Sequence, residues 1–205
     1  MPVLTFAAGK ALSSKHEEAL ASLRSVRTYL LPDGGAGFKL DDAQPLVRAP
    51  VLHAPFGPKT WEAGGRATLL LNVPNSAANQ TFIAYLYMLL RRLRRLVRER
   101  AHELNLSEAE LKQALTTLTV LKDPSNARFA QQITLRLPPA AQRGRQPRYD
   151  VKAKKGGAII DSAHLNAPDL MLRPTFTVAG VHCRREHGRV ALSVALDMRE
   201  VSILS

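Results

Sequence analysis

Two long apolar runs near the C-terminus constrain the fold of this chain more than any other feature. They are TFTVAGVHC and GRVALSVALDM, and the polar sequence RREHG joins them. In the second run, apolar residues occupy every second position from Val190 to Met198. This is the period of a strand with one buried face. The two runs therefore predict a hairpin of long antiparallel strands, and the fold must contain a sheet with a core on one side.

Further segments fit strands of the same sheet. RATLLLNVP, residues 66–74, is apolar and bounded by Gly-Gly and Pro-Asn, which is typical of a well-buried strand. ARFAQQITLRLPP alternates apolar with polar residues and predicts a strand with one polar face. YDVKAKKGGAII predicts a hairpin around Gly156 and Gly157. SVRTYLLP and TTLTVLKD are also predicted strands, and the four prolines at 45–58 predict an edge strand or an extended loop.

The stretch FIAYLYMLLRRLRRLVRER belongs to a predicted helix over about residues 77–104. Wound at 100° per residue, it places Phe82 and a row of leucines on one side and arginines on the other. Its apolar run, 82–90, is nine residues long, whereas a membrane-spanning helix needs about 20. We therefore expect the leucine stripe to pack on the sheet. A basic helix lying on an anionic membrane is the weaker alternative.

Two shorter helices are predicted from capping boxes, which pair a serine with a glutamate three residues later. Ser14 and Glu17 predict a helix over 14–24, and Ser107 and Glu110 predict a second one. With about seven to nine strands, these elements indicate one α+β domain that is mainly β. We expect a single domain over 1–205, with an N-terminal extension at 1–44 and a core at 45–205.

The charge balance points to an anionic partner. The chain has 29 Lys and Arg against 17 Asp and Glu, a net charge of +12. Such an excess favours encounter with nucleic acid or an acidic surface. The single cysteine, Cys183, allows no internal disulfide, and the N-terminus lacks the pattern of a secretory signal. We therefore expect an intracellular protein, in the nucleus or the cytoplasm.

No arrangement of residues indicates an enzyme. The sequence contains no GxxxxGK[ST], GxGxxG, GxSxG or HExxH pattern. His182 and Cys183 are adjacent on a predicted strand, so their side chains point to opposite faces and do not pair as base and nucleophile. His182, Cys183 and His187 are too few for a structural zinc site. We expect no metal and no cofactor.

Three groups of residues are candidate nucleic-acid contacts. Basic residues with an aromatic among them suit a single strand, because the charges follow the phosphates and the ring stacks on a base. The first group is a basic loop and hairpin, the second a proline-rich segment and the strand after it, and the third the arginine side of the long helix. The predicted contacts are Arg143, Arg145, Arg148, Tyr149, Lys152, Lys154 and Lys155; then Lys59, Trp61 and Arg66; and then Arg91 and Arg95. Solvated surface is the open alternative for each.

The order of elements resembles the single-stranded DNA-binding proteins of large DNA viruses and T7-type phages. The resemblance rests on APFG at 54–57, the strand 67–73, the helix from Phe82 and the hairpin 174–196, and it covers about residues 45–200. It implies an OB-fold-like antiparallel barrel of five strands, with one long amphipathic helix inserted between strands. The chain departs from this family in its last residues, MREVSILS, where such proteins usually carry an acidic tail.

The resemblance and the charge together suggest a non-enzymatic protein that binds single-stranded DNA with little sequence preference, in replication or recombination. The open alternative is an architectural component of a ribonucleoprotein or a virion that binds RNA or DNA. We expect single-stranded DNA as the partner, with RNA also open, and replication proteins and further copies of the chain as additional candidates. No membrane partner is expected.

Overall fold

The computed structural model describes residues 3–30, 35–41, 44–60, 67–124, 130–140, 147–186 and 188–204. These ranges form one twelve-stranded sheet and three α-helices. The helices are α1 (Ser14–Ser22), α2 (Gln80–Glu99) and α3 (Glu108–Thr117), and a 3-10 helix spans Ser162–Asn166. The strands are β1 (Val3–Leu4), β2 (Ser25–Leu30), β3 (Ala36–Leu40), β4 (Leu46–Arg48), β5 (Leu52–Ala54), β6 (Lys59–Thr60), β7 (Ala67–Val73), β8 (Gln131–Leu137), β9 (Lys152–Lys155), β10 (Ala158–Ile160), β11 (Leu170–Glu186) and β12 (Arg189–Ile203).

Five of the strands close into a barrel. β5 pairs with β7, β7 with β8, β8 with β12, β12 with β11, and β11 returns to β5. The β8–β12 contact is parallel and the other four are antiparallel. A five-stranded barrel is the architecture of the OB fold. The protein therefore has the predicted α+β, mainly β, OB-like fold, with the long helix α2 between β7 and β8.

β11 and β12 form the long hairpin that the two apolar runs predict. Their pairing extends from Leu172 and Ile203 to Glu186 and Arg189, with two register shifts. At the second shift, β3 passes so close to Gly180 that a Cβ atom there would lie 2.1 Å from the carbonyl oxygen of Phe38. Glycine therefore allows β11 to pair with β12 and β3 at the same place.

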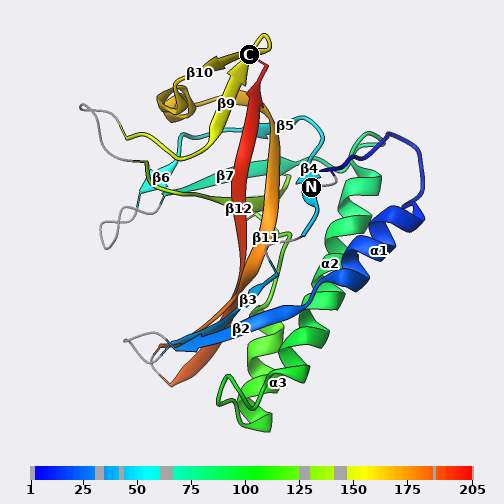
Figure 1. Cartoon of the computed structure of the whole chain (residues 1–205), viewed down its shortest axis with the longest axis vertical. Coiled ribbons are helices and arrows are strands. Elements are labelled where there is room, and N and C mark those ends of the chain that lie inside the picture. The colour runs from blue at the N-terminus through cyan, green and yellow to red at the C-terminus, as the bar shows by residue number, and fades with distance from the viewer. Residues whose placement is uncertain are drawn as a thin grey trace.

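The three helices lie together on one side of the β11–β12 hairpin (Figure 1). α2 is amphipathic, as its sequence predicts, and it turns an apolar stripe toward the core. The Phe82 ring meets Phe176 of β11 edge to face, with centroids 6.5 Å apart. The buried side chains of α2 are Thr81, Phe82, Tyr85, Leu86, Leu89, Leu93, Leu96 and Val97. The apolar side of α2 thus forms part of the hydrophobic core. In the described part of the chain, no helix combines the length and apolar character needed to cross a membrane.

The first predicted capping box is displaced by one residue. α1 begins after Ser13, and its partner three residues on is His16, whose Nδ1 accepts a hydrogen bond from the Ser13 N–H at 3.1 Å. Because Nδ1 accepts, Nε2 carries the proton and donates to the Thr5 carbonyl at 3.1 Å. The second predicted box is confirmed, since Ser107 N–H donates to Glu110 Oε2 at 2.8 Å.

One predicted strand is wrong. TTLTVLKD begins inside α3, which continues to Thr117, and its later part contributes a single bridge between Lys122 and Gln132. The confirmed capping box starts a helix of ten residues, and that helix extends into the predicted strand. The described strands also number twelve, more than the seven to nine expected, because the segment from 45 to 60 forms three short strands, β4, β5 and β6, and because β1 and β3 were not predicted.

The N-terminal residues share the core of the barrel. Leu20 of α1 and Phe38 and Leu40 of β3 belong to the same cluster of buried residues as Phe176 and Met198. β3 also pairs directly with β11. β2, β3 and α1 therefore extend the sheet and cover one side of the barrel.

Candidate nucleic-acid interface

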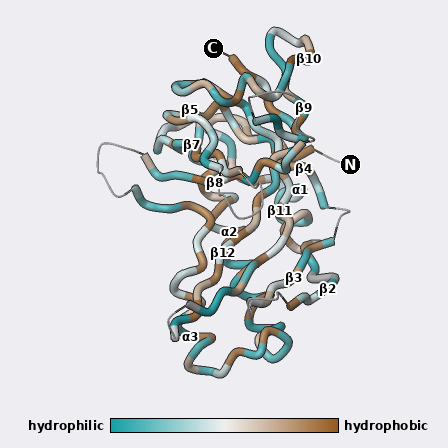
Figure 2. Tube along the Cα trace, turned by 90° about the vertical axis from the view of Figure 1, so that its left-hand side faces the viewer, coloured by the Kyte–Doolittle hydropathy of each residue, from teal (hydrophilic) through white to brown (hydrophobic). Residues whose placement is uncertain are grey.

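The strand side chains that point away from the core form a surface that we call the outer face. In β11, Phe176 and Val178 are buried, while Arg173 and Thr177 point the other way. Directly paired residues of neighbouring strands share a face, so the pairing extends this surface from one strand to the next. Figure 2 views the molecule from the side of the sheet opposite to the helices.

The outer face is strongly positive. Leaving aside the Glu186–Arg189 pair beside the hairpin turn, the described strands carry ten basic side chains on this face, from eight strands, against two carboxylates. Eight of the basic side chains are exposed, and Arg136 and Lys154 are partly buried. The basic residues are Arg27, Lys39, Arg48, Lys59, Arg136, Lys152, Lys154, Arg173, Arg184 and Arg199; the carboxylates are Asp197 and Glu200. Such an excess creates a positive potential over the sheet.

Both carboxylates are held by basic neighbours. Asp197 Oδ1 accepts from Arg136 Nε at 2.6 Å, and Glu200 Oε1 accepts from Lys154 Nζ at 2.9 Å. The hydrogen bond from Lys154, opposed by desolvation, lowers the pKa of Glu200 below its usual value. The eight exposed cations therefore set the charge of the surface that solvent meets.

Arg27 of β2 lies directly opposite Lys39 of β3. Both side chains are exposed. Like charges at directly paired positions destabilise a sheet. An anion bound between them would remove this repulsion. The pair is thus a place where the sheet carries a local electrostatic cost.

A chain of hydrogen bonds crosses the middle of the outer face. Arg136 Nη1 lies 2.7 Å from His182 Nε2, and His182 Nδ1 contacts the Tyr29 hydroxyl. A guanidinium can only donate, so His182 Nε2 accepts and its Nδ1–H donates to the Tyr29 oxygen. Since Arg136 is also bound to Asp197, side chains of β12, β8, β11 and β2 form one connected network.

A second polar chain lies on the same face near β5. His53 Nε2 lies 2.6 Å from Asp169 Oδ1, Asn72 Nδ2 lies 3.4 Å from His53 Nδ1, and Gln132 Nε2 donates to Asn72 Oδ1 at 3.0 Å. The order Asp, His, Asn resembles part of a hydrolase site. The third member is an amide, which is not a nucleophile, so this chain orients side chains and does not form a catalytic group.

Several predicted contacts do lie on the outer face. Lys59 of β6 is exposed there, and its partner in β7 is Thr68, which in turn pairs with Arg136. Lys152 and Lys154 are on the outward side of β9, since Ala153 between them is buried. Lys155 is exposed at the turn of the β9–β10 hairpin, which forms around Gly156 and Gly157 as predicted.

Tyr149 was expected to present an exposed ring, and this expectation is wrong. Its side chain is 5% exposed. Its backbone N–H donates to Ser162 Oγ at 2.9 Å and its hydroxyl donates to Asn166 Oδ1 at 2.7 Å. Burial raises the pKa of the phenol. The neighbouring Arg148 forms an ion pair with Asp161 at 2.8 Å. Both side chains therefore attach this segment to the 3-10 helix region.

Four predicted contacts, Trp61, Arg66, Arg143 and Arg145, lie outside the described residues. The segment with Trp61 and Arg66 joins β6 to β7.

The helix arginines do not share the outer face. Arg91 and Arg95 are exposed on α2, on the side of the molecule where the helices lie, and Arg95 pairs with Glu99 at 3.0 Å. Arg92 and Arg94 turn inward and donate to the carbonyls of Leu23 and Leu118, at 2.7 and 3.3 Å. Two of the five arginines of α2 therefore tie the helix to its neighbours.

Six of the eight exposed outer-face cations were missed from the sequence, as was the partly buried Arg136. Each of the six is a basic residue inside a short or long strand, and none lies in a long basic run. They are Arg27, Lys39, Arg48, Arg173, Arg184 and Arg199. Strict alternation with buried residues, as around Arg173 in β11, is the signal that could have shown their direction. Their assembly on one surface depends on strand pairing.

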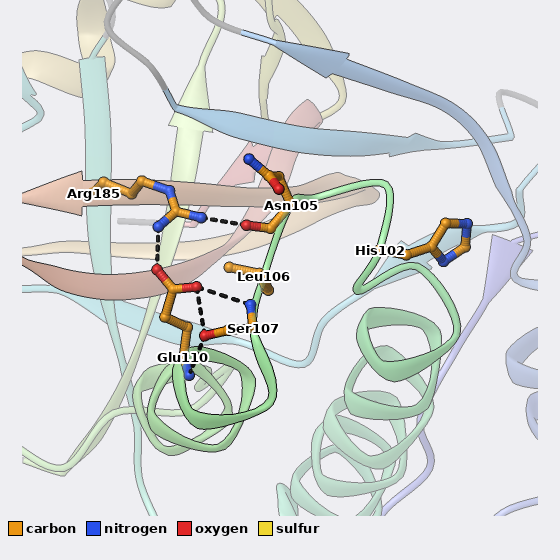
Figure 3. A pocket seen from close by; sticks show the side chains of 6 residues that line it. All are labelled: His102, Asn105, Leu106, Ser107, Glu110 and Arg185. Carbon is orange, nitrogen blue, oxygen red and sulfur yellow. Dashed lines mark hydrogen bonds and ion pairs between the residues drawn. The ribbon is translucent and has the colours of Figure 1, made fainter.

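A hollow lies beside the start of α3. It is lined by His102, Asn105, Leu106, Ser107, Glu110 and Arg185. Figure 3 shows Arg185 reaching Glu110 and the Asn105 carbonyl, whereas His102 stands apart. The Arg185 guanidinium is thus used to fasten β11 to the α3 turn. Among the described residues, no group of three or more His, Cys, Asp and Glu side chains is placed to hold a metal ion.

The fold and the outer face define an OB-like protein with a basic sheet surface. No protein-family model and no curated protein sequence matches the chain. Two solved structures align with most of it. The single-stranded DNA-binding protein of bacteriophage Enc34, truncated at its C-terminus, has a TM-score of 0.49 and 10% identity, over 90% of this chain and 96% of that chain. The Enc34 protein in complex with single-stranded DNA has a TM-score of 0.47 and 10% identity, over 88% and 94%. Because both scores are low, the function proposed for this chain rests on its own charges and geometry.

Proposed function

We propose that this protein binds single-stranded DNA on its outer face, with little sequence preference and without enzymatic activity. It would act in replication or recombination inside the cell, in the nucleus or the cytoplasm, as in the viral and phage family that its order of elements resembles. Replication proteins and further copies of the chain are the additional partners that this role implies.

The observation that carries the proposal is the charge of the outer face. Eight exposed cations from seven strands lie on the outer face, and the carboxylates Asp197 and Glu200 of that face are already bound. Lysine and arginine on such a surface bind phosphates, which carry no sequence information. A flexible single strand can follow these cations across the pleated sheet without the groove geometry that a duplex requires.

The alternative, an architectural protein that binds folded RNA or packaged DNA, uses the same phosphate contacts. A titration separates the two. Anisotropy of labelled oligo-dT, a duplex and a structured RNA is measured at about 50 mM and about 200 mM salt. The proposal predicts tightest binding to oligo-dT, with a log-log salt slope of about −0.7 for each phosphate neutralised. Equal affinity for the duplex would exclude it, and a preference for structured RNA would favour the alternative.

Matched variants locate the surface. The triple variant Arg27→Gln, Lys39→Gln and Arg184→Gln removes three outer-face charges, and the control, Arg91→Gln with Arg95→Gln, removes two charges from α2. We expect the triple variant to lose roughly ten-fold or more in affinity, with a salt slope smaller by about 2. The control should bind nearly as the wild type does. A larger effect in the control would place the site on the helix side.

A further inference from the structure

Tyr29 occupies a position on the outer face that the sequence did not single out. Its strand partner in β3 is Gly37, which in turn pairs with His182 of β11. A Cβ atom on Gly37 would lie 2.4 Å from the Tyr29 hydroxyl oxygen and 2.6 Å from its Cζ. The phenol end of Tyr29 therefore lies over Gly37, across the strand, and the ring is partly exposed.

The ring is held in this position by neighbours. The Tyr29 hydroxyl contacts His182 Nδ1, and the two rings meet nearly edge to face with centroids 5.7 Å apart. His182 is itself fixed by Arg136 at 2.7 Å, and Arg136 by Asp197 at 2.6 Å. A ring that is oriented before binding loses little freedom on contact with a ligand.

Exposed cations surround the ring on the same face. Arg27 lies two residues before Tyr29 along β2, Lys39 lies two residues after Gly37 along β3, and Arg184 lies two residues after His182 along β11. Residues two apart in a strand are about 7 Å from one another. Arg27 is thus about 7 Å from Tyr29 along the same strand, while Lys39 and Arg184 lie one and two strands away and about 7 Å further along.

We infer that Tyr29 is a stacking position for an unpaired nucleobase, with Arg27, Lys39 and Arg184 binding the adjoining phosphates. The inference rests on the proposed function and deepens it, because it assigns the contact that distinguishes a single strand from a duplex. Base faces are covered in a duplex and accessible in a single strand, and stacking does not depend on base identity. His182 acts as a positioning residue that sets the ring.

A purely structural role for Tyr29 is the competing explanation, because an aromatic ring over a strand glycine also stabilises a sheet. The two explanations differ in what removal of the ring does to binding. Loss of stacking weakens binding to strands that have bases and leaves the phosphate contacts unchanged. Loss of structure weakens all binding together and lowers the melting temperature.

The test compares wild type, Tyr29→Phe and Tyr29→Leu on oligo-dT and on an abasic strand of the same length. We expect Tyr29→Leu to bind oligo-dT roughly five- to a hundred-fold more weakly, with unchanged salt slope and unchanged abasic affinity. Tyr29→Phe should stay within about two-fold of wild type, since it keeps the ring that stacking requires. Unchanged oligo-dT affinity in Tyr29→Leu, or an equal loss on both strands, would overturn the inference.

A cross-linking measurement on the wild type covers the case in which Tyr29→Leu does not fold. Irradiation of an oligonucleotide containing 5-bromouracil should attach it to the peptide that includes Tyr29. Cross-links found only elsewhere would overturn the inference while the proposed function stands. If the wild type binds neither oligo-dT nor the abasic strand, the proposed function itself fails, and the inference fails with it.

Discussion

Arg136 and Asp197 form an ion pair at 2.6 Å across the one residue pair through which β8 and β12 meet within the described strands. This contact is parallel and closes the barrel. The two side chains are 29% and 18% exposed, so water screens their attraction less than it would at an open surface. A closure with so little backbone pairing depends on side chains to hold it.

Asp197→Asn should therefore destabilise the protein. It weakens a charge-assisted hydrogen bond and leaves Arg136 without its carboxylate, and such bonds contribute about 1.5–3 kcal/mol. We expect a loss of about 2 kcal/mol in the free energy of unfolding, measured with urea. The matched control is Glu99→Gln, which breaks the exposed Arg95–Glu99 pair and should change stability by less than about 0.5 kcal/mol. Similar losses in both would show that the closure does not depend on this pair.

Gly180→Ala should be among the most damaging small substitutions. The new methyl group would lie 2.1 Å from the Phe38 carbonyl oxygen, which is backbone and cannot rotate away. Overpacking of this kind costs about 1–3 kcal/mol or more. Gly9→Ala is the control, because Gly9 also has a positive φ, +69°, but nothing lies within 4 Å of its added Cβ. It should cost about 1–2 kcal/mol. Thermal melts measure the stability of both variants. Equal melting temperatures would show that the close approach of Gly180 to the Phe38 carbonyl does not require glycine.

Local periodicity explains what the sequence predicts correctly. The β11–β12 hairpin and the leucine stripe of α2 each follow from residues that are neighbours in the chain, through periods of 2 and 3.6. The barrel closure does not, because Arg136 and Asp197 are 61 residues apart and one pair of contacts leaves no periodic signal. A family resemblance could therefore suggest the OB-like topology, whereas the periodic pattern alone does not specify it.

The candidate site was only partly predictable for a related reason. Sequence reasoning selects charges that cluster along the chain, such as those of α2 and of residues 143–155. The cations of the outer face come one or two at a time from eight strands, and only strand pairing brings them together. The burial of Tyr149 was within reach, however. Tyr149, Val151 and Ala153 occupy alternate positions, and residues at alternate positions of an extended segment point to the same side, which here is the core.

Tyr149→Phe tests the assignment of that ring to the core. The substitution keeps the ring and removes the hydroxyl that donates to Asn166 at 2.7 Å. We expect a loss of about 1 kcal/mol in unfolding free energy, the usual contribution of such a bond. Tyr149→Leu should cost more stability, yet the folded protein should keep wild-type affinity for oligo-dT, unlike Tyr29→Leu. A binding defect in Tyr149→Leu at a temperature where it is folded would show that Tyr149 takes part in nucleic-acid binding.

The acid stability of the protein should depend on Glu110. Hydrogen bonds from the Ser107 backbone N–H and hydroxyl, and from Arg185, lower the pKa of this carboxyl from its ordinary 4.5 to about 2. A carboxyl with a lowered pKa in the folded state stabilises the fold above the unfolded-state pKa and loses that contribution as the pH falls through the folded-state value. Wild type should thus lose stability between about pH 4.5 and about pH 2 from this group.

Glu110→Gln lacks the titrating group, so its deficit in unfolding free energy relative to wild type should be largest at neutral pH and shrink across the same range. Ser107→Ala removes the hydroxyl bond and keeps the backbone N–H. Its folded-state pKa should lie between the wild-type and ordinary values, so its own acid loss should be smaller and should be complete at a higher pH. Urea unfolding at a series of pH values measures all three proteins. A deficit for Glu110→Gln that is constant with pH would show that its role is packing and not charge.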